Sequence, residues 1–280
     1  MFDPYTRTVR ISSMGVDLVV TDHGPSDGEA VLMLHGFPDS AWLWRNQIPR
    51  LADAGYRVLA PDLRGFGRSD KPGSVEEYTL RRHAGDVRAI VGHFGVERAH
   101  VVGHDWGAAL TWYLGVVDPE LFRTATVLSV GHPTVFASAG LEQKRRSWYM
   151  LLFQFPDVAE QWLSDDDWKW FREWSGSPAE VDHWIEQLSR PGALTAALNI
   201  YRANMAPETW AAPPPELPPM PCDTLAVWSA GDSVLLESQV VDSQRYVSGR
   251  WRFERIEDAD HWIPLTAPDR LANLLLDWLG

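Results

Sequence analysis

The chain has 280 residues, of which 45% are hydrophobic and 22% are charged, which is enough to build one large folded domain or two small ones. Lysine and arginine (25) are outnumbered by aspartate and glutamate (38), so the net charge is −13. Because an acidic protein repels phosphate backbones and anionic lipids, we expect no nucleic-acid partner and no membrane partner. Neutral small substrates are compatible with this charge.

Cysteine content and the N-terminal sequence narrow the class of protein further. The single cysteine, Cys222, cannot form an internal disulfide, and no Cys/His cluster has the spacing of metal ligands, so we expect no metal site. The first 15 residues contain charged side chains and no apolar run of a secretion signal. No later stretch is long and apolar enough to span a membrane. The expected location is the cytoplasm.

Hydrophobic periodicity predicts alternating strands and helices in the first half of the chain. Two antiparallel strands over residues 7–20 turn at Met14-Gly15, and a short apolar run at 30–34 predicts a buried strand. Helices are then expected at 42–54, 78–94 and 106–117, and strands at 56–60, 99–102 and 124–130. Such alternation is typical of an α/β protein with a mostly parallel sheet.

The alternation stops at Gly131-His132-Pro133 and resumes only at Thr224. Residues 134–219 are helix-like and hold seven of the fifteen tryptophans, so we interpret them as a helical cap inserted after the sixth strand of a core formed by 1–133 and 220–280. The proline-rich stretch 211–221 is better explained as a stiff return linker than as a polyproline ligand. A strand (224–229), a helix (236–246), a strand (251–256) and a helix (267–279) are expected to complete the core.

The most informative motif is Gly103-His-Asp105-Trp-Gly107, between a predicted strand and a predicted helix. A nucleophile flanked by small residues at this position is typical of the nucleophile elbow, where glycine permits a strained turn and the helix N-terminus favours an ionised carboxylate. The alternative is that Asp105 only caps the helix. An aspartate nucleophile is already ionised at neutral pH and suits attack on saturated carbon, which forms an alkyl ester.

Hydrolysis of such an ester needs a general base and an oxyanion hole. His261 follows a predicted strand and precedes the last helix, and Asp232 follows the strand before it, which gives the hydrolase order of nucleophile, acid and histidine. The alternatives are a buried structural histidine and an ordinary turn aspartate. From their positions, the backbone N–H groups of Phe37 and Trp106 are the expected oxyanion-hole donors.

Together these motifs resemble the epoxide hydrolases of the α/β-hydrolase superfamily over nearly the whole chain. The segments His35-Gly-Phe-Pro-Asp-Ser40, Asp62-Leu-Arg-Gly-Phe-Gly-Arg-Ser-Asp70 and Gly103 to Gly107 are similar to the family's core. The segments Tyr149-Met-Leu-Leu-Phe-Gln-Phe-Pro156 and Asn199-Ile-Tyr-Arg-Ala-Asn-Met205 resemble those that carry its two proton-donating tyrosines. The resemblance implies an α/β fold with an eight-stranded, mostly parallel sheet, flanking helices and an inserted helical cap.

The resemblance also implies a reaction: an epoxide is converted to a vicinal diol through an ester on Asp105, while Tyr149 and Tyr201 polarise the epoxide oxygen and no cofactor takes part. A neutral phenol can donate a hydrogen bond to the alkoxide that forms as the ring opens. The aromatic residues of the cap, including Trp148, Phe153 and Phe155, suggest a mainly apolar substrate pocket. A homo-oligomer is compatible with the sequence.

Other functions deserve comparison. Haloalkane dehalogenases share an aspartate nucleophile, and the indole of Trp106 could hold a halide, but the second halide donor is missing where Phe37 stands and a halide does not need two tyrosines. A haloacid substrate calls for a basic cluster that is not evident. A non-catalytic binding protein would not need a complete catalytic set. Relatives often have glycine where Asp260 stands; this acid would raise the pKa of His261 if it faced the ring, but we expect it to point to solvent.

Overall fold

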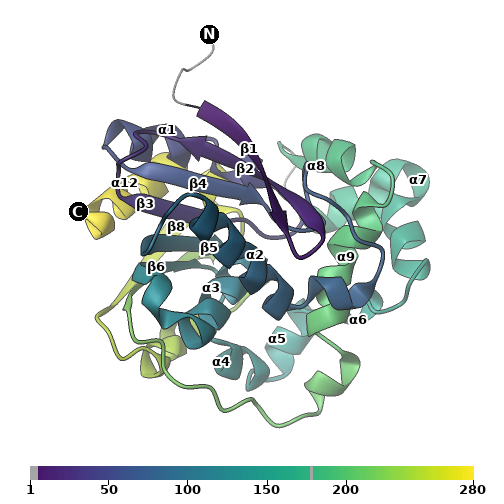
Figure 1. The fold of residues 1–280 in the computed structure, drawn as a ribbon. Helices are drawn as coiled ribbons and strands as arrows, with labels where there is room; N and C mark the ends of the chain where they lie inside the picture. Colours follow the sequence, from purple (N-terminus) through teal and green to yellow (C-terminus); the bar gives the residue numbers. More distant parts are fainter. Residues whose placement is uncertain (1–5, 177–178) are drawn as a thin grey trace.

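The computed structural model describes residues 6–176 and 179–280, and its centre is an eight-stranded sheet in the order β1-β2-β4-β3-β5-β6-β7-β8 (Figure 1). The strands are β1 (Thr6–Ser13), β2 (Val16–His23), β3 (Ala30–Leu34), β4 (Arg57–Asp62), β5 (Ala99–His104), β6 (Phe122–Leu128), β7 (Asp223–Gly231) and β8 (Trp251–Asp260). β2 pairs antiparallel with β1 and β4, and all other neighbours are parallel. The predicted mostly parallel sheet is confirmed.

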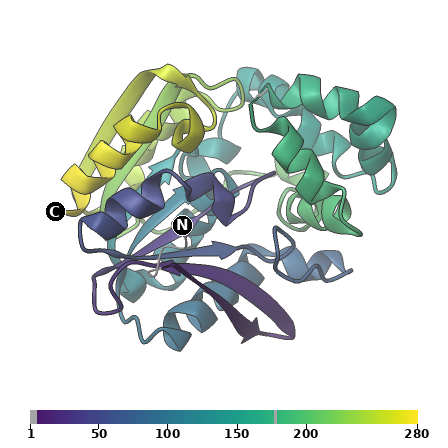
Figure 2. The same cartoon turned by 90° about the horizontal axis from the view of Figure 1, so that it is seen from above.

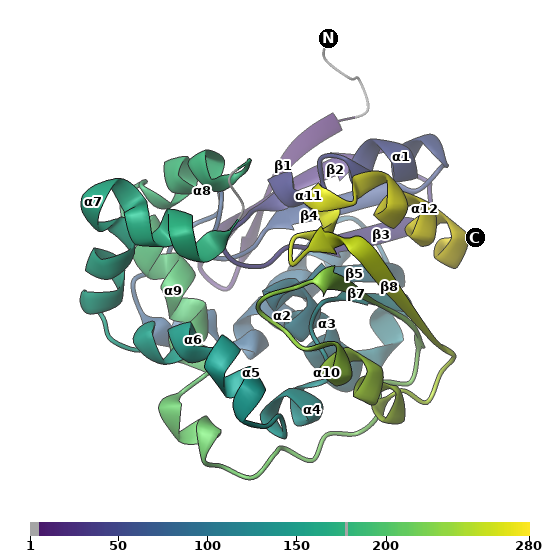
Figure 3. The ribbon, with the colours of Figure 1, turned by 180° about the vertical axis from the view of Figure 1, so that it is seen from behind.

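The central strands are buried on both faces, which explains why they read as continuous apolar runs. All five residues of β3 and all six of β5 are buried, because helices cover both sides of a parallel sheet. Helices α1 (Gln47–Asp53) and α12 (Pro268–Leu279) pack side by side on one face, as Figure 3 shows. Helices α2 (Leu80–His93) and α3 (Trp106–Val117) contact each other on the other face. Two shorter helices, α10 (Glu237–Asp242) and α11 (Ile263–Thr266), follow β7 and β8.

Several predicted helices are shorter than expected. The helix expected at 42–54 is a 3₁₀ turn, η1 (Ala41–Trp44), followed by α1, because Pro49 lacks an N–H and must lie in the first turn of an α-helix. Likewise α2 is preceded by η2 (Val75–Tyr78) and begins after Thr79, whose side chain accepts from the N–H of Arg82. The helix expected at 236–246 ends in a 3₁₀ turn, η5 (Ser243–Tyr246).

Between β6 and β7 the described chain is helical, apart from its connections. Its elements are α4 (Pro133–Ala137), α5 (Leu141–Arg146), α6 (Trp148–Leu152), α7 (Val158–Ser175), α8 (Val181–Leu188), α9 (Ala193–Asn204) and η4 (Pro207–Trp210). Figure 2 shows α7, α8 and α9 grouped at one side of the sheet, in green. In the described ranges no helix is both long and apolar enough to cross a membrane. The division into a core and a cap stays a prediction.

The carboxyl ends of four parallel strands deliver the predicted site residues to one edge of the sheet. β3 leads into His35 and Gly36, β5 into Asp105, β7 into Asp232 and β8 into His261. In open α/β sheets, ligands bind in the crevice outside these strand ends.

Candidate active site

Asp105 occupies a sharp turn between β5 and α3. Its φ of 52° and ψ of −120° lie where residues with a side chain are rarely found, so the turn is strained. The turn is possible because the residues two positions before and two positions after Asp105 are glycines. A Cβ atom on Gly107 would lie 2.0 Å from the carbonyl oxygen of Leu34, and one on Gly103 would lie 2.3 Å from that of Gly107. The strand and helix can therefore approach closely and hold the carboxylate at the tip of the turn.

Two backbone N–H groups face this carboxylate, as the sequence predicts. The N–H of Phe37 donates to Oδ1 of Asp105 at 2.8 Å, and a hydrogen bond from the backbone of Trp106 helps to stabilise the ionised form. Burial alone raises the pKa of Asp105, but the contact and positive charge of His261 and the Trp106 N–H hold it below its usual range. Asp105 is thus an anion, with one oxygen engaged by the backbone.

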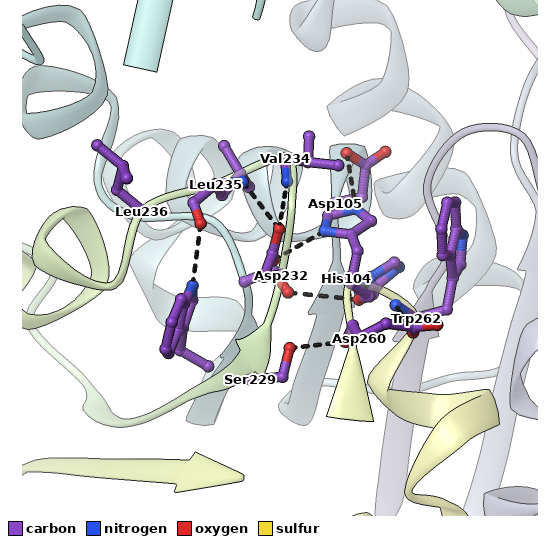
Figure 4. A network of polar contacts seen from close by, with 12 residues as sticks. His104, Asp105, Ser229, Asp232, Val234, Leu235, Leu236, Asp260 and Trp262 are labelled. Carbon is purple, nitrogen blue, oxygen red and sulfur yellow. Dashed lines mark hydrogen bonds and ion pairs between the residues drawn. The ribbon is translucent and has the colours of Figure 1, made fainter. Parts of the chain in front are cut away.

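His261 lies between two carboxylates. Its Nδ1 is 2.9 Å from Oδ2 of Asp232, and its Nε2 is 3.7 Å from Oδ2 of Asp105. The second oxygen of Asp232 accepts the N–H groups of Val234 and Leu235, both at 2.8 Å (Figure 4). Burial lowers the pKa of His261, but the two carboxylates outweigh it and raise the pKa to about 10. The imidazole is therefore protonated at neutral pH in this arrangement.

The position of His261 is fixed through its backbone. Nε2 of His104 lies 2.8 Å from the carbonyl oxygen of His261, and burial, followed by the charge of His261, lowers the pKa of His104 to about 4. His104 is therefore neutral and donates this bond. Oδ1 of Asp260 accepts the N–H of Trp262, which precedes α11, and the hydroxyl of Thr266, the last residue of α11. The Asp260 carboxylate is thus partly exposed and bonded to residues that follow His261, and these contacts do not involve the His261 ring.

The two predicted tyrosines lie against the elbow from different helices. Tyr149 on α6 and Tyr201 on α9 are each 2% exposed, and their ring centroids are 6.0 Å apart at 80°. The ring of Tyr201 also lies 5.0 Å from that of Trp106. Burial raises the pKa of both phenols well above 10; the charge of Asp105 adds to the shift for both, and Tyr149 adds to that of Tyr201. Both phenols therefore stay protonated and can donate hydrogen bonds.

Comparison with known proteins shows the family of this chain. A family model described as the alpha/beta hydrolase fold matches residues 29–268. The chain belongs to this family. Epoxide hydrolase A of Mycobacterium tuberculosis is 31% identical to this hydrolase, and the match covers 96% of each chain. The AB hydrolase superfamily protein YfhM of Bacillus subtilis is 33% identical, also over 96% of each chain.

Solved structures support the same relationship. An epoxide hydrolase of Bacillus megaterium in complex with an inhibitor has a TM-score of 0.87 and 25% identity to this hydrolase, covering 97% of this chain and 99% of the other. A structure titled as novel epoxide hydrolases from metagenomes of hot environments has a TM-score of 0.88 and 27% identity, covering 98% of both chains. The resemblance to epoxide hydrolases that the motifs indicate is confirmed.

A cavity of about 410 Å³ opens beside the elbow of this hydrolase. Asp105, Trp106 and Tyr149 lie in its wall, and most of the remaining lining is apolar, including Val130, Pro133, Phe136, Ala137, Ala139, Met150, Met205, Trp210, Pro213, Pro215, Val234 and Leu235. Among the described residues, no group of three His, Cys, Asp or Glu side chains could hold a metal ion.

The structure corrects part of the predicted pocket. Trp148 and Phe155 are 46% and 59% exposed and do not line the cavity. Trp148 precedes Tyr149 on α6, and neighbouring helical residues point in different directions, so burying Tyr149 turns Trp148 outward. Phe153 is fully buried, but it packs 5.4 Å from Tyr149 and 5.1 Å from Tyr201 and supports the two rings from behind.

Two parts of the cavity wall were missed by sequence reasoning. The proline-rich segment, predicted only as a linker, contributes Pro213 and Pro215, and the carbonyl of Pro215 accepts the hydroxyl of Thr134 at 2.7 Å. The second is Gln143 on α5, which is 2% exposed although it lies in a polar stretch of sequence. A polar residue on a short charged helix gives no sequence signal of burial.

Proposed function

We propose that this hydrolase converts an epoxide into a vicinal diol through a covalent ester on Asp105. The observation that carries the proposal is the pair of buried phenols, Tyr149 and Tyr201, packed against an elbow that holds aspartate where many hydrolases hold serine. Relatives named epoxide hydrolases support the same activity. The chemistry follows in two half-reactions.

In the first half-reaction, Oδ2 of Asp105 attacks one carbon of the epoxide ring. The new Oδ2–carbon bond forms as the ring carbon–oxygen bond breaks, and the alkoxide takes a proton from the phenol pair. Oδ1 already accepts the N–H of Phe37 at 2.8 Å, so it is placed to become the carbonyl oxygen of the ester. The raised pKa of both tyrosines keeps them in the donor form.

In the second half-reaction, a water molecule attacks the Cγ atom of Asp105. Esterification removes the negative charge of Asp105, which is one of the groups that raise the pKa of His261, so the pKa of the imidazole falls. The imidazolium then releases its proton, which restores the phenol by way of solvent, and the neutral ring can accept the proton of water. Asp232 holds the other ring nitrogen. The Phe37 and Trp106 N–H groups stabilise the oxyanion until the Cγ–Oδ2 bond breaks. Protonated His261 returns the proton to the departing Oδ2, and the diol leaves with that oxygen.

The cavity suggests the class of substrate. Its volume of about 410 Å³ and its mainly apolar wall favour an epoxide with an alkyl or aryl body. A cytoplasmic location and a homo-oligomer stay predictions from the sequence.

The decisive test is diol formation from a panel of alkyl and aryl epoxides, with Asp105→Ala as the blank. We expect diol from the wild type and none above the uncatalysed rate from the variant. Halide release from haloalkanes is measured in parallel, because a dehalogenase could use the same aspartate. Halide without diol would overturn the proposal in favour of dehalogenation.

A further inference from the structure

The segment that follows β7 sets the position of Asp232. One carboxylate oxygen accepts the N–H groups of Val234 and Leu235, and the other contacts His261 (Figure 4). The imidazole orientation therefore depends on the backbone of residues 232–236, which we call the acid loop. From the strand side, the indole of Trp228 donates to the carbonyl of Leu235 at 3.2 Å.

On its other side, the acid loop is held by two side chains of helix α5. Nη1 of Arg146 donates to the carbonyl oxygen of Asp232 at 2.9 Å. Nε2 of Gln143 donates to the carbonyl oxygen of Val234 at 2.9 Å, and Oε1 of Gln143 accepts the N–H of Leu236 at 3.2 Å. Positions 143 and 146 are three residues apart and so lie on one face of the helix.

The Gln143 amide is used to its full capacity. Besides the acid loop, Nε2 donates to the hydroxyl of Ser147 at 2.8 Å, and Oε1 accepts Nε2 of Gln239 at 2.6 Å. With two donors and one acceptor oxygen, the side chain makes four hydrogen bonds while 2% exposed. A buried amide satisfied in this way specifies one geometry, because any shift leaves polar groups without partners and without water.

The same helix leads directly to the first tyrosine. Ser147, the partner of Gln143, separates α5 from α6, and Tyr149 is the second residue of α6. Tyr149 is also held by ring contacts with Phe153 and Trp174, at 5.4 and 4.9 Å, which do not involve the acid loop. Loss of the Gln143 contacts should therefore disturb Asp232 more than Tyr149.

We propose that Gln143 and Arg146 are positioning residues that couple α5, which leads into the helix carrying Tyr149, to the loop carrying Asp232. This inference rests on the proposed function. These two side chains, which we call the clamp, hold the acid loop in place. Through Asp232, they keep the imidazole of His261 positioned beside Asp105, where the ester forms. Its loss should slow ester hydrolysis while ring opening continues.

The test measures the two half-reactions separately in a single turnover, with ester formation and decay followed by intact mass. Gln143→Met fills the same volume without hydrogen bonds. Because Gln143 also lies in the cavity wall, ester formation is measured at saturating substrate, where we expect it to change by less than about threefold while ester decay slows by about tenfold or more. Arg146→Met removes the bond to Asp232 and an exposed ion pair with Glu142 at 3.4 Å, and should slow ester decay by about fivefold, with Arg146→Lys restoring much of the rate.

The matched control is Arg145→Met on the same helix, where the side chain is exposed and should leave both rates at their wild-type values. If Gln143→Met does not fold, Arg146→Met and its lysine rescue decide the question. Equal slowing of both half-reactions, or no change in either, would overturn the clamp. Failure of the proposed function looks different, because then no ester forms in the wild type or in His261→Gln.

Discussion

Nε2 of His261 lies 3.7 Å from Oδ2 of Asp105, a distance that allows an ion pair but is too long for a good hydrogen bond. The imidazole can therefore serve a reaction at Asp105 without blocking attack by its carboxylate.

The first prediction separates the two half-reactions. His261→Gln should form the ester and then stall, because Asp105 needs no base to attack but its ester needs one to be hydrolysed. Intact mass after mixing with substrate should show one added epoxide per chain. Asp105→Ala should show no adduct, and normal turnover by His261→Gln would remove this histidine from the mechanism.

A second prediction concerns stability and pH. The pKa of His261 is about 10 in the folded protein and near 6.5 when unperturbed, so between these values the folded chain holds a proton that the unfolded chain has lost. This stabilisation is complete below pH 6.5 and is lost as pH rises toward 10. Between pH 7 and 9 the wild-type free energy of unfolding should fall by up to about 1.4 kcal/mol per pH unit more than that of His261→Gln.

Denaturant unfolding at pH 7, 8 and 9 measures both slopes. His93→Gln, which changes an exposed histidine near the end of α2, should keep the wild-type slope. Identical slopes for wild type and His261→Gln would mean that His261 does not hold its proton between the two carboxylates.

The sequence predicted the sheet and the meeting of Asp105, Asp232 and His261 at one edge because both depend on local signals. Continuous apolar runs mark strands such as β3 and β5, and the elbow needs glycines at 103 and 107 wherever its strand and helix meet. His261 and Asp232 each follow a strand, and the parallel sheet brings such residues to one edge.

What the sequence did not predict depends on contacts between distant segments. Gln143 is buried because its amide makes hydrogen bonds with the backbone of Val234 and Leu236, about ninety positions away. No residue near Gln143 in the sequence indicates these contacts. Trp148 and Tyr149 are neighbours of similar character, and only the packing of α6 decides which one faces Asp105. Short helices with apolar residues on several sides leave that choice to tertiary structure.

The third prediction concerns the tyrosines. Tyr149→Phe combined with Tyr201→Phe keeps both rings but removes both proton donors, so ring opening should slow by about 100-fold or more. The rate of ester appearance is best measured in the His261→Gln background. Displacement of halide from a haloalkane, if any occurs, should not slow, since a halide leaves without a proton. Ester formation at the wild-type rate would show that both tyrosines only pack in the interior and do not protonate the epoxide oxygen.

The last prediction tests how closely the loop after β3 approaches the nucleophile. A Cβ atom on Gly36 would lie 2.2 Å from Oδ1 of Asp105, so Gly36→Ala must displace either the carboxylate or the Phe37 N–H that binds it. We expect kcat/KM to fall by about 100-fold or more and stability to fall by about 1–3 kcal/mol. Gly92→Ala is the matched control, since a Cβ atom there meets nothing within 4 Å and alanine favours the α2 helix by about 0.5–1 kcal/mol. Kinetics on the epoxide panel and denaturant unfolding of both variants measure the two effects, and wild-type activity in Gly36→Ala would show that the carboxylate does not depend on this close approach.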